Sequence, residues 1–357
     1  MPEFTLADNP DALVTELGHP DRVGIDTEFM REKTYFSELC LVQVATHDRI
    51  LIADPQSAPS MSKFWEAVLV IPWVLHSGRQ DIEVIYQAAR RMPTSVFDTQ
   101  IAAALLGHPP QMGYASLVSD LFGVELDKSH TRADWSRRPL TDALLHYAAE
   151  DVEHLLPAYD LLAERLDKKG RLAWAQEDSE LLLDRTLYEM HPEQAIARLK
   201  GARSLRGTRL AAAAKLAEWR ETEALRANRP RQWIVKDSVL IDLATRMPSS
   251  TRDLGHIDGL AAGLIRRSGR KIISAIAASA SENTAHSRPR PPNEAQKALL
   301  QSMQKRVAEC AADLGLATET IASKRDLSAV IINGERSPRL LTGWRRELIG
   351  EELLGLL

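Results

Sequence analysis

The chain has 357 residues, of which 44% are hydrophobic and 26% charged, and its formal net charge is −4, so it is long enough for two or three folded domains of ordinary composition. No stretch approaches the roughly 18 apolar residues of a membrane span, and the acidic start, MPEFTLADNP, lacks the basic and then apolar order of a signal peptide. Only Cys40 and Cys310 are present, which predicts a reducing, cytoplasmic location and excludes a disulfide framework.

Strand-like runs follow one another closely near the N-terminus, at residues 22–29, 39–47 and 49–55. The gaps between these runs are too short for helical crossovers, so we expect an antiparallel meander. Further on, each strand-like run is followed by a helix-like run, in the order 73–77, 79–91, 95–98 and 99–107. A meander followed by alternation predicts an α/β fold, with helices on either side of a mixed sheet.

The first of these strands carries two acids on one face. In RVGIDTEFM (residues 22–30), Asp26 and Glu28 occupy alternate positions, so two like charges lie within roughly 7 Å of each other. A half-buried strand with a solvated acidic face is one interpretation. An Asp-x-Glu pattern recurs from Asp81 and from Asp151, so the pattern alone does not distinguish that interpretation from a functional site.

The run that begins at Thr141, TDALLHYAAEDVEHLLPAYDLLAERL, has the periodicity of an amphipathic helix. Thr141 is suited to cap the start of this helix, and Pro157 is expected to bend it. Tyr147 and Asp151 are four residues apart, which makes them neighbours on one helical face.

Beyond residue 110 the patterns are helical throughout. Two units, one starting near Thr208 and one at Glu294, share the order of a long helix, a short apolar stretch and further helices, and the polar, Pro-rich stretch 281–293 separates them. We interpret them as diverged copies of one small helical domain. The predicted domains are residues 1–200, 201–284 and 293–357.

Charge is divided unevenly along the chain. Residues 1–200 contain 19 Lys and Arg against 32 Asp and Glu, whereas residues 201–357 contain 26 against 17. This asymmetry predicts that the C-terminal part binds a polyanion, with the basic segments 266–271 and 343–348 as candidate contacts. An uneven scatter of surface charge is the alternative.

Several segments resemble a known family. IDTEF, LHSGRQD and HYAAED are similar to the three exonuclease motifs of the DEDD family, in the subclass with Tyr before the last Asp. LDKSHTRADWSRRPL, FDTQIAAALLG and LTGWRREL resemble the ribonuclease D branch, and the two helical units resemble the helicase-and-ribonuclease-D C-terminal (HRDC) domain that this branch carries in tandem. The resemblance covers nearly the whole chain. It implies an RNase H-like mixed sheet with flanking helices, followed by two small all-α domains.

The resemblance also implies an activity, namely a 3′→5′ exoribonuclease that trims RNA 3′ ends, such as those of tRNA precursors, and releases nucleoside 5′-monophosphates. Its metal ligands would be Asp26, Glu28, Asp81 and Asp151. Carboxylates gathered in this way can hold two Mg²⁺ or Mn²⁺ ions about 3.5–4 Å apart, which would offset the repulsion between Asp26 and Glu28. Tyr147 would orient or help deprotonate the attacking water; positioning is the better role for a side chain with a pKa near 10.

Four further residues are candidate RNA contacts: His76, Lys128, Arg132 and Trp135. The last three are equally suited to hold their loop in place by packing and pairing, and His76 to a structural role at a strand end. Asp98 is better suited to a helix N-cap than to the site, and Gln43 is interpreted as a sheet residue, with contact to the substrate as the minor alternative.

Two other functions are compatible with parts of the pattern. A DNA 3′-exonuclease of proofreading type uses the same carboxylates, but the chain contains no polymerase region and carries the tandem C-terminal repeats. A nucleic-acid-binding scaffold with an inert core is opposed by the complete set of acids and by Tyr147. The expected partner is RNA, with no membrane contact, and the expected state is a monomer.

Overall fold

The structure is a computed structural model that describes residues 2–7, 9–57, 60–127, 130, 133–279, 292–333 and 338–357. It contains two compact units. The first comprises Met1–Met30, Leu39–Tyr188 and Pro289–Leu357, and the second comprises Arg31–Glu38 and Glu189–Arg288. The predicted linker at 281–293 lies almost entirely outside the described residues, and the predicted domain limits stay a prediction. In the described part of the chain, no helix is long and apolar enough to cross a membrane.

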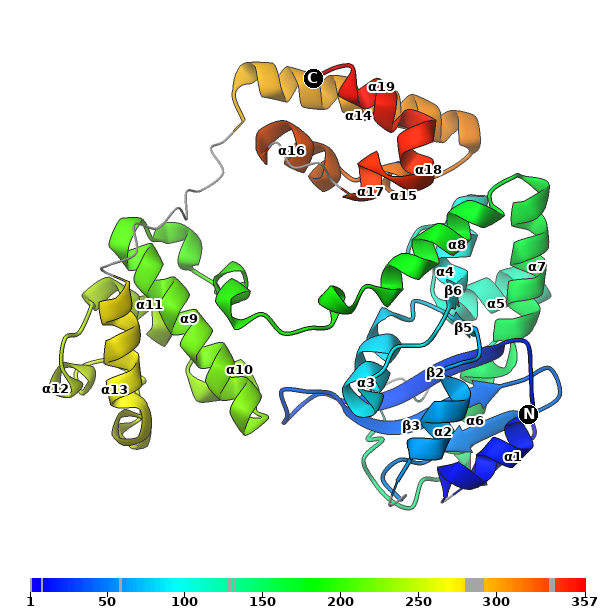
Figure 1. Cartoon of the computed structure of the whole chain (residues 1–357), viewed down its shortest axis with the longest axis horizontal. Coiled ribbons are helices and arrows are strands. Elements are labelled where there is room, and N and C mark those ends of the chain that lie inside the picture. Colours follow the sequence, from blue (N-terminus) through cyan, green and yellow to red (C-terminus); the bar gives the residue numbers. More distant parts are fainter. Residues whose placement is uncertain are drawn as a thin grey trace. The chain divides into compact units, whose positions relative to one another are not determined.

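A mixed six-stranded sheet forms the centre of the first unit, and it confirms the predicted α/β class (Figure 1). Its strands are β1 Phe4–Ala7, β2 Val23–Met30, β3 Glu38–Ala45, β4 Ile50–Ala53, β5 Trp73–Leu75 and β6 Val96–Asp98. Their order in the sheet is β1-β4-β3-β2-β5-β6, in which β3 and β4 are antiparallel while β1–β4, β2–β5 and β5–β6 are parallel. Strand β1 was not predicted, because four residues are too few to display a period of two.

Eight α-helices lie between Leu13 and Glu180 in the described part of the first unit. They are α1 Leu13–Leu17, α2 Ser62–Val68, α3 Arg79–Ala89, α4 Thr99–Leu106, α5 Tyr114–Phe122, α6 Asp142–Glu153, α7 Leu155–Lys168 and α8 Leu172–Glu180. One face of the sheet shares a core with α1, α2 and α3, through residues such as Phe64 and Ile82. The opposite face shares a core with α6 and α7, through Leu145, Val152 and Leu155. Each side of the sheet is therefore covered.

The predicted helix from Thr141 is present but broken. The Thr141 side chain caps α6 by accepting a hydrogen bond from the backbone N–H of Leu144 (3.4 Å), as expected. Pro157 breaks the helix at His154 instead of bending it, since proline has no N–H and its ring collides with the carbonyl four residues before it, that of Glu153. Asp151 consequently lies in the last turn of α6.

The second unit is helical, with α9 Gly207–Ala227, α10 Arg231–Ile234, α11 Asp237–Arg246, α12 Thr251–Leu254 and α13 Ala262–Ala278. The segment Arg31–Glu38, which connects β2 to β3 along the chain, belongs to this unit. The Tyr35 hydroxyl donates to Glu221 Oε1 at 2.5 Å, and Asn228 Oδ1 accepts the backbone N–H groups of Tyr35 and Phe36 at 3.1 Å. These bonds hold the connecting segment on the helical domain.

The C-terminal helices belong to the first unit and are α14 Glu294–Leu314, α15 Thr318–Ile321, α16 Lys324–Asn333, α17 Pro338–Leu341, α18 Gly343–Arg345 and α19 Glu351–Leu354. They share one hydrophobic core with α4, α7 and α8. Met303 and Val307 of α14 belong to the same buried cluster as Ala102, Leu162 and Ala175. The C-terminal domain is thus packed as a continuation of the sheet-containing domain.

A buried polar network fixes this packing. Arg345 is 1% exposed and forms a bidentate ion pair with Asp178, in which Nη2 lies 2.6 Å from Oδ2. Trp344 donates its indole N–H to the same carboxylate at 3.2 Å, and its ring stacks on Trp174 with centroids 4.4 Å apart. The prediction that segment 343–348 contacts a polyanion is therefore wrong for Arg345, because its charge is enclosed and already paired.

Candidate active site

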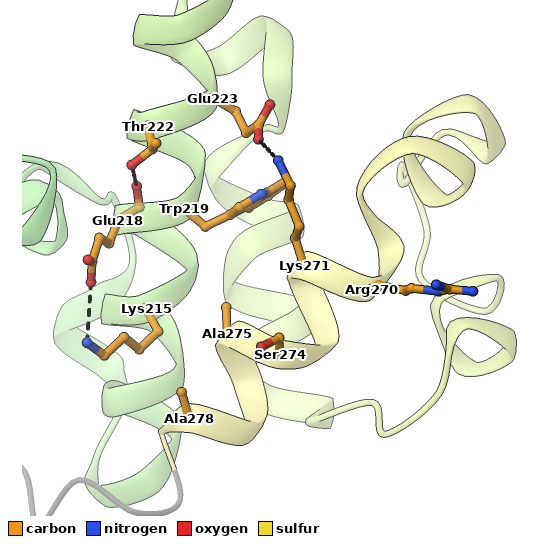
Figure 2. A pocket seen from close by; sticks show the side chains of 10 residues that line it. All are labelled: Lys215, Glu218, Trp219, Thr222, Glu223, Arg270, Lys271, Ser274, Ala275 and Ala278. Carbon is orange, nitrogen blue, oxygen red and sulfur yellow. Dashed lines mark hydrogen bonds and ion pairs between the residues drawn. The ribbon is translucent and has the colours of Figure 1, made fainter.

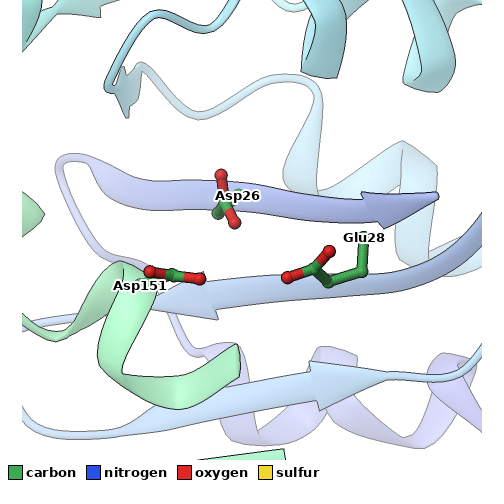
Figure 3. Close-up of side chains that lie close together, drawn as sticks. All are labelled: Asp26, Glu28 and Asp151. Atoms are coloured by element: carbon green, nitrogen blue, oxygen red, sulfur yellow. The ribbon is translucent and has the colours of Figure 1, made fainter. Parts of the chain in front are cut away.

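Three of the four predicted ligand residues converge in the first unit. The carboxylates of Asp26 and Glu28, from β2, and of Asp151, from α6, each offer an oxygen, and these oxygens lie within 4.8 Å of one another. Figure 3 shows the three side chains together. The alternation of β2 places both strand acids on the face that α6 covers, and the last turn of α6 brings Asp151 to them.

Asp81, the fourth predicted ligand, lies in the first turn of α3 and is 8% exposed. Its Oδ1 accepts a hydrogen bond from the Thr27 hydroxyl at 2.6 Å. Its carboxylate is not part of the group of three, but its charge raises the pKa values of Asp26 and Glu28. Asp81 is therefore an electrostatic neighbour of the cluster, and its carboxylate is held by a hydrogen bond from Thr27, the residue between the two strand acids.

Burial is the largest cause of raised pKa values in this cluster, and mutual repulsion of the carboxylates adds to it. These two effects raise the pKa of Glu28 to about 9 and hold that of Asp26 well above its usual range. They raise the pKa of Asp151 to about 7, against a hydrogen bond from Tyr147 that lowers it. Burial raises the pKa of Asp81 to about 6, against the Thr27 hydrogen bond. Among the described residues, no Lys or Arg is a main cause of these pKa shifts, so this part of the structure supplies little compensating positive charge.

This donor set fits divalent cations. Every ligand is a carboxylate oxygen, which is the donor type that Mg²⁺ and Mn²⁺ prefer. A bound cation would supply the missing positive charge and so favour the ionised form of all three carboxyl groups. The residues present therefore suit a divalent metal, as the sequence predicts.

Tyr147 lies beside the cluster, four residues before Asp151 on α6. Its hydroxyl is hydrogen-bonded to the Asp151 carboxylate. Burial, and then the charges of Asp151, Glu28 and Asp26, raise the pKa of Tyr147 above its usual value, so the hydroxyl is protonated at neutral pH. The rings of Trp135 and His130 lie 6.1 and 5.8 Å from the Tyr147 ring, measured between centroids, and flank it. The hydroxyl is thus a fixed hydrogen-bonding group.

The structure describes two of the four candidate RNA contacts, Trp135 and His76. Trp135 is 3% exposed and belongs to the core with Leu145, which favours the packing role considered for it. Both ring nitrogens of His76 lie 2.9 Å from protein oxygens, those of the Thr99 hydroxyl and the Met112 carbonyl, which favours the structural role considered for it. Lys128 and Arg132 lie outside the described residues.

Asp98 caps α4, as favoured above, and its Oδ1 accepts a hydrogen bond from the Gln100 backbone N–H at 2.8 Å.

Sequence reasoning missed three residues of the site. Thr27 lies between the two strand acids, and its position in IDTEF was the available signal. His130 lies within the quoted LDKSHTRADW segment. Tyr114 had no signal: its ring lies 5.5 Å from that of His76, its hydroxyl accepts the His154 N–H at 3.1 Å, and burial, followed by nearby carboxylates including Asp151 and Asp26, raises its pKa.

We expect the metal-free protein to lose stability as pH rises from about 5 to about 9. In the unfolded chain the carboxyl groups titrate near pH 4, whereas in the folded state Asp81, Asp151 and Glu28 hold protons up to about pH 6, 7 and 9. Between about pH 4 and these folded-state pKa values, the folded state binds more protons than the unfolded state. The stabilisation that the protons provide is complete below about pH 4 and is lost as the pH rises through the folded-state pKa values. Thermal melting in EDTA at pH 5, 7 and 9 measures this loss of stability.

The matched control is Glu28→Gln, which removes the carboxyl group whose pKa is raised to about 9. Its melting temperature in EDTA should fall less between pH 7 and pH 9 than that of the wild type. Melting temperatures of the wild type that rise over this range would contradict the expected titration.

A pocket of about 600 Å³ lies on the second unit, between α9 and α13 (Figure 2). Lys215 and Trp219 line it from α9, and Arg270 and Lys271 from α13. Lys271 is paired with Glu223 at 2.6 Å, while Arg270 extends away from that ion pair and is exposed. The pocket thus combines cations with an aromatic side chain, and it contains part of the predicted basic segment 266–271.

Comparison with protein families gives three matches. Residues 3–167 match a 3′–5′ exonuclease family, residues 209–276 the HRDC domain, and residues 295–353 the C-terminal HRDC domain of ribonuclease D. The first match contains all four predicted ligand residues and Tyr147.

Curated relatives are similar over nearly their whole length. Ribonuclease D of Gluconacetobacter diazotrophicus is 37% identical over 366 residues, covering 99% of this chain and 92% of the relative. Ribonuclease D of Acidiphilium cryptum is 38% identical over 374 residues, covering 100% and 93%. The crystal structure of Escherichia coli RNase D, described as an exoribonuclease involved in structured RNA processing, is similar with a TM-score of 0.88 and 28% identity, covering 99% of this chain and 98% of that one.

Proposed function

The chain belongs to the ribonuclease D family and is a 3′→5′ exoribonuclease, and from this premise we propose that it trims the 3′ ends of structured RNAs such as tRNA precursors. The observation that carries the proposal is the group of three carboxylates within 4.8 Å, beside a tyrosine hydrogen-bonded to one of them. The curated relatives are ribonucleases, which supports RNA over DNA as the substrate. The monomeric, cytoplasmic state stays a prediction.

Asp26, Glu28 and Asp151, with Asp81 beside them, would hold two divalent cations, Mg²⁺ or Mn²⁺. Such ions activate a water for attack on the terminal phosphodiester and stabilise charge on the leaving 3′-oxygen. The protein itself supplies a fixed set of oxygen ligands, because β2 and α6 are locked by the core between them. Each cleavage would release one nucleoside 5′-monophosphate.

Tyr147 would orient the attacking water. Its hydroxyl is protonated at neutral pH and bonded to Asp151, so it is a poor base but a well-placed hydrogen-bonding group. Trp135 and His130 hold the ring in place by contact. These two residues would affect the reaction only by positioning Tyr147.

The direct test of the activity uses an RNA carrying a label at its 3′ end. The purified protein with Mg²⁺ or Mn²⁺ should release labelled nucleoside 5′-monophosphate stepwise, faster from RNA than from DNA of the same sequence, and EDTA should stop the release. Release of internal fragments, or equal rates on DNA, would contradict the proposal.

RNA binding beyond the active site would use the pocket between α9 and α13. Arg270 can contact a backbone phosphate, and so can Lys215 if it exchanges its 3.4 Å ion pair with Glu218 for a phosphate; Trp219 can provide a surface for a base. This surface lies in the part of the chain with the excess of Lys and Arg, whereas the acidic part repels phosphate until cations occupy its site.

The double variant Lys215→Gln, Arg270→Gln should bind a structured RNA more weakly, with a shallower dependence on salt. Each lost phosphate contact lowers the slope of log K against log salt by about 0.7–0.9, so the slope should fall by about 1.5. Binding to RNA at several salt concentrations measures it. The control is Arg252→Gln, an exposed arginine of α12 outside the pocket, which should keep the wild-type slope. Equal slopes for the double variant and the wild type would exclude this surface.

A further inference from the structure

Gln43 is the side chain that the fold explains least. It lies in the middle of β3 and is 0% exposed, and neither its Oε1 nor its Nε2 has a hydrogen-bond partner among the described residues. Buried amides are almost always hydrogen-bonded, because leaving their donors and acceptors unpaired is costly. Leu41 and Ala45, two residues away on the same face of β3, are buried hydrophobic residues, and its register partner on β4 is the buried Ile52. The sheet therefore offers an environment that suits an apolar residue.

The position of Gln43 in the sheet places it next to the acidic cluster. Strands β3 and β2 are neighbours, and a Cβ built on Gly24 lies 3.4 Å from the Cβ of Ala45. The start of β2 thus faces the end of β3 on one side of the sheet, so the two strands run antiparallel. In an antiparallel pair, moving two residues forward on one strand corresponds to moving two residues back on the other. Gly24 faces Ala45, so Asp26 faces Gln43 on the same side of the sheet.

Two independent observations therefore point to the same place. The cluster of carboxylates fits a cation, and an unpaired amide lies in the adjacent strand position. A ligating carboxylate uses one lone pair for the metal, and its remaining lone pairs are held by neighbouring donors, which fixes its orientation. The Gln43 amide is such a donor, and no other function in the described structure accounts for it.

We propose that Gln43 is a positioning residue of the metal site, whose Nε2–H donates to the Asp26 carboxylate when a divalent cation is bound. This inference rests on the proposed two-metal function. It assigns to β3 a part in the site that otherwise consists of β2, α3 and α6. Gln43 acts through Asp26 and does not itself contact the reacting atoms.

The test replaces the amide with an apolar side chain of similar length, Gln43→Met, in the full chain. Titration with Mn²⁺ followed by calorimetry should give a dissociation constant about 10–100-fold higher than that of the wild type, as is typical for loss of an outer-shell partner. The melting temperature in EDTA should stay the same or rise, since a costly buried amide is removed. Turnover of a short RNA should fall while KM changes little.

Leu41→Met, a substitution of similar volume on the same face of β3, is the control and should keep the wild-type Mn²⁺ affinity. Gln43→Leu is the second variant in case methionine disturbs the packing. Mn²⁺ affinity within about twofold of wild type in either folded variant would overturn the proposal, and so would unfolding of both in EDTA, which would give the amide a structural role. Failure of the wild type itself to bind Mn²⁺ would instead refute the proposed metal-dependent function.

Discussion

Asp26→Asn should abolish hydrolysis and leave a folded protein. Asp26 is at the centre of the cluster, since the charges of Asp81, Asp151 and Glu28 all act on it. Removing one electrostatic stabiliser of a transition state costs about 10²–10³-fold in rate. Loss of a ligand shared between two cations should exceed that, so we expect at least about 10³-fold lower turnover of a 3′-labelled RNA in Mg²⁺ and in Mn²⁺.

The same variant should be more stable than the wild type without metal. The neutral amide removes one of several like charges that are held close together, and its shape is nearly unchanged. Melting in EDTA at pH 8 measures this effect. Asp160→Asn, at an exposed position of α7 whose carboxylate pairs with Arg22 at 3.7 Å, is the control and should alter neither turnover nor metal response. Turnover near the wild-type level in Mn²⁺ would refute the role of Asp26.

The second large effect is expected for Tyr147→Phe. The ring and its contacts with Trp135 and His130 survive this change, and only the hydroxyl bonded to Asp151 is lost. Groups that position or transfer a proton contribute about 10²–10⁴-fold, so the rate of the chemical step should fall by at least about 10²-fold, with RNA affinity nearly unchanged. Single-turnover kinetics with excess enzyme measure the step directly.

Tyr159→Phe provides the matched control, since Tyr159 of α7 is partly buried, packs edge-to-face on Phe97 and is not one of the residues assigned to the site. Its rate should stay within about threefold of wild type. The same small change for Tyr147→Phe would assign Tyr147 to packing.

The sheet and its functional acids could be predicted because their signals are local. Alternation in residues 22–29 identifies β2 and the shared face of Asp26 and Glu28, and a spacing of four identifies the pairing of Tyr147 with Asp151. The break at His154 also follows from a local rule, since Pro157 interrupts the helix that the sequence interpretation expected it only to bend. These features depend on backbone geometry within a few residues.

Other features depend on contacts between distant segments, and no local pattern carries them. Arg345 looks like part of a basic, solvated helix until Asp178 is found beside it, 167 residues earlier in the chain. Gln43 alternates like any strand residue, and only its enclosure and its neighbour Asp26 make it unusual. The hydrogen bond from Thr27 to Asp81 spans 54 residues. Such pairings are consequences of the tertiary fold.

The core shared by α4, α7, α8 and α14 has a consequence for the newly made chain. The second unit is inserted, in sequence, between two segments that fold together, so the sheet-containing segment leaves the ribosome well before the helices that cover it. Synthesis from Glu189 to Leu357 takes on the order of 10 s, at about 5–20 residues per second. During that interval the apolar side chains around Leu162 and Ala175 lie uncovered on the nascent chain, which makes it a substrate for chaperones, and a chain released early is a target for proteolysis. Completion of synthesis, and not completion of the catalytic segment, therefore decides when a stable nuclease exists.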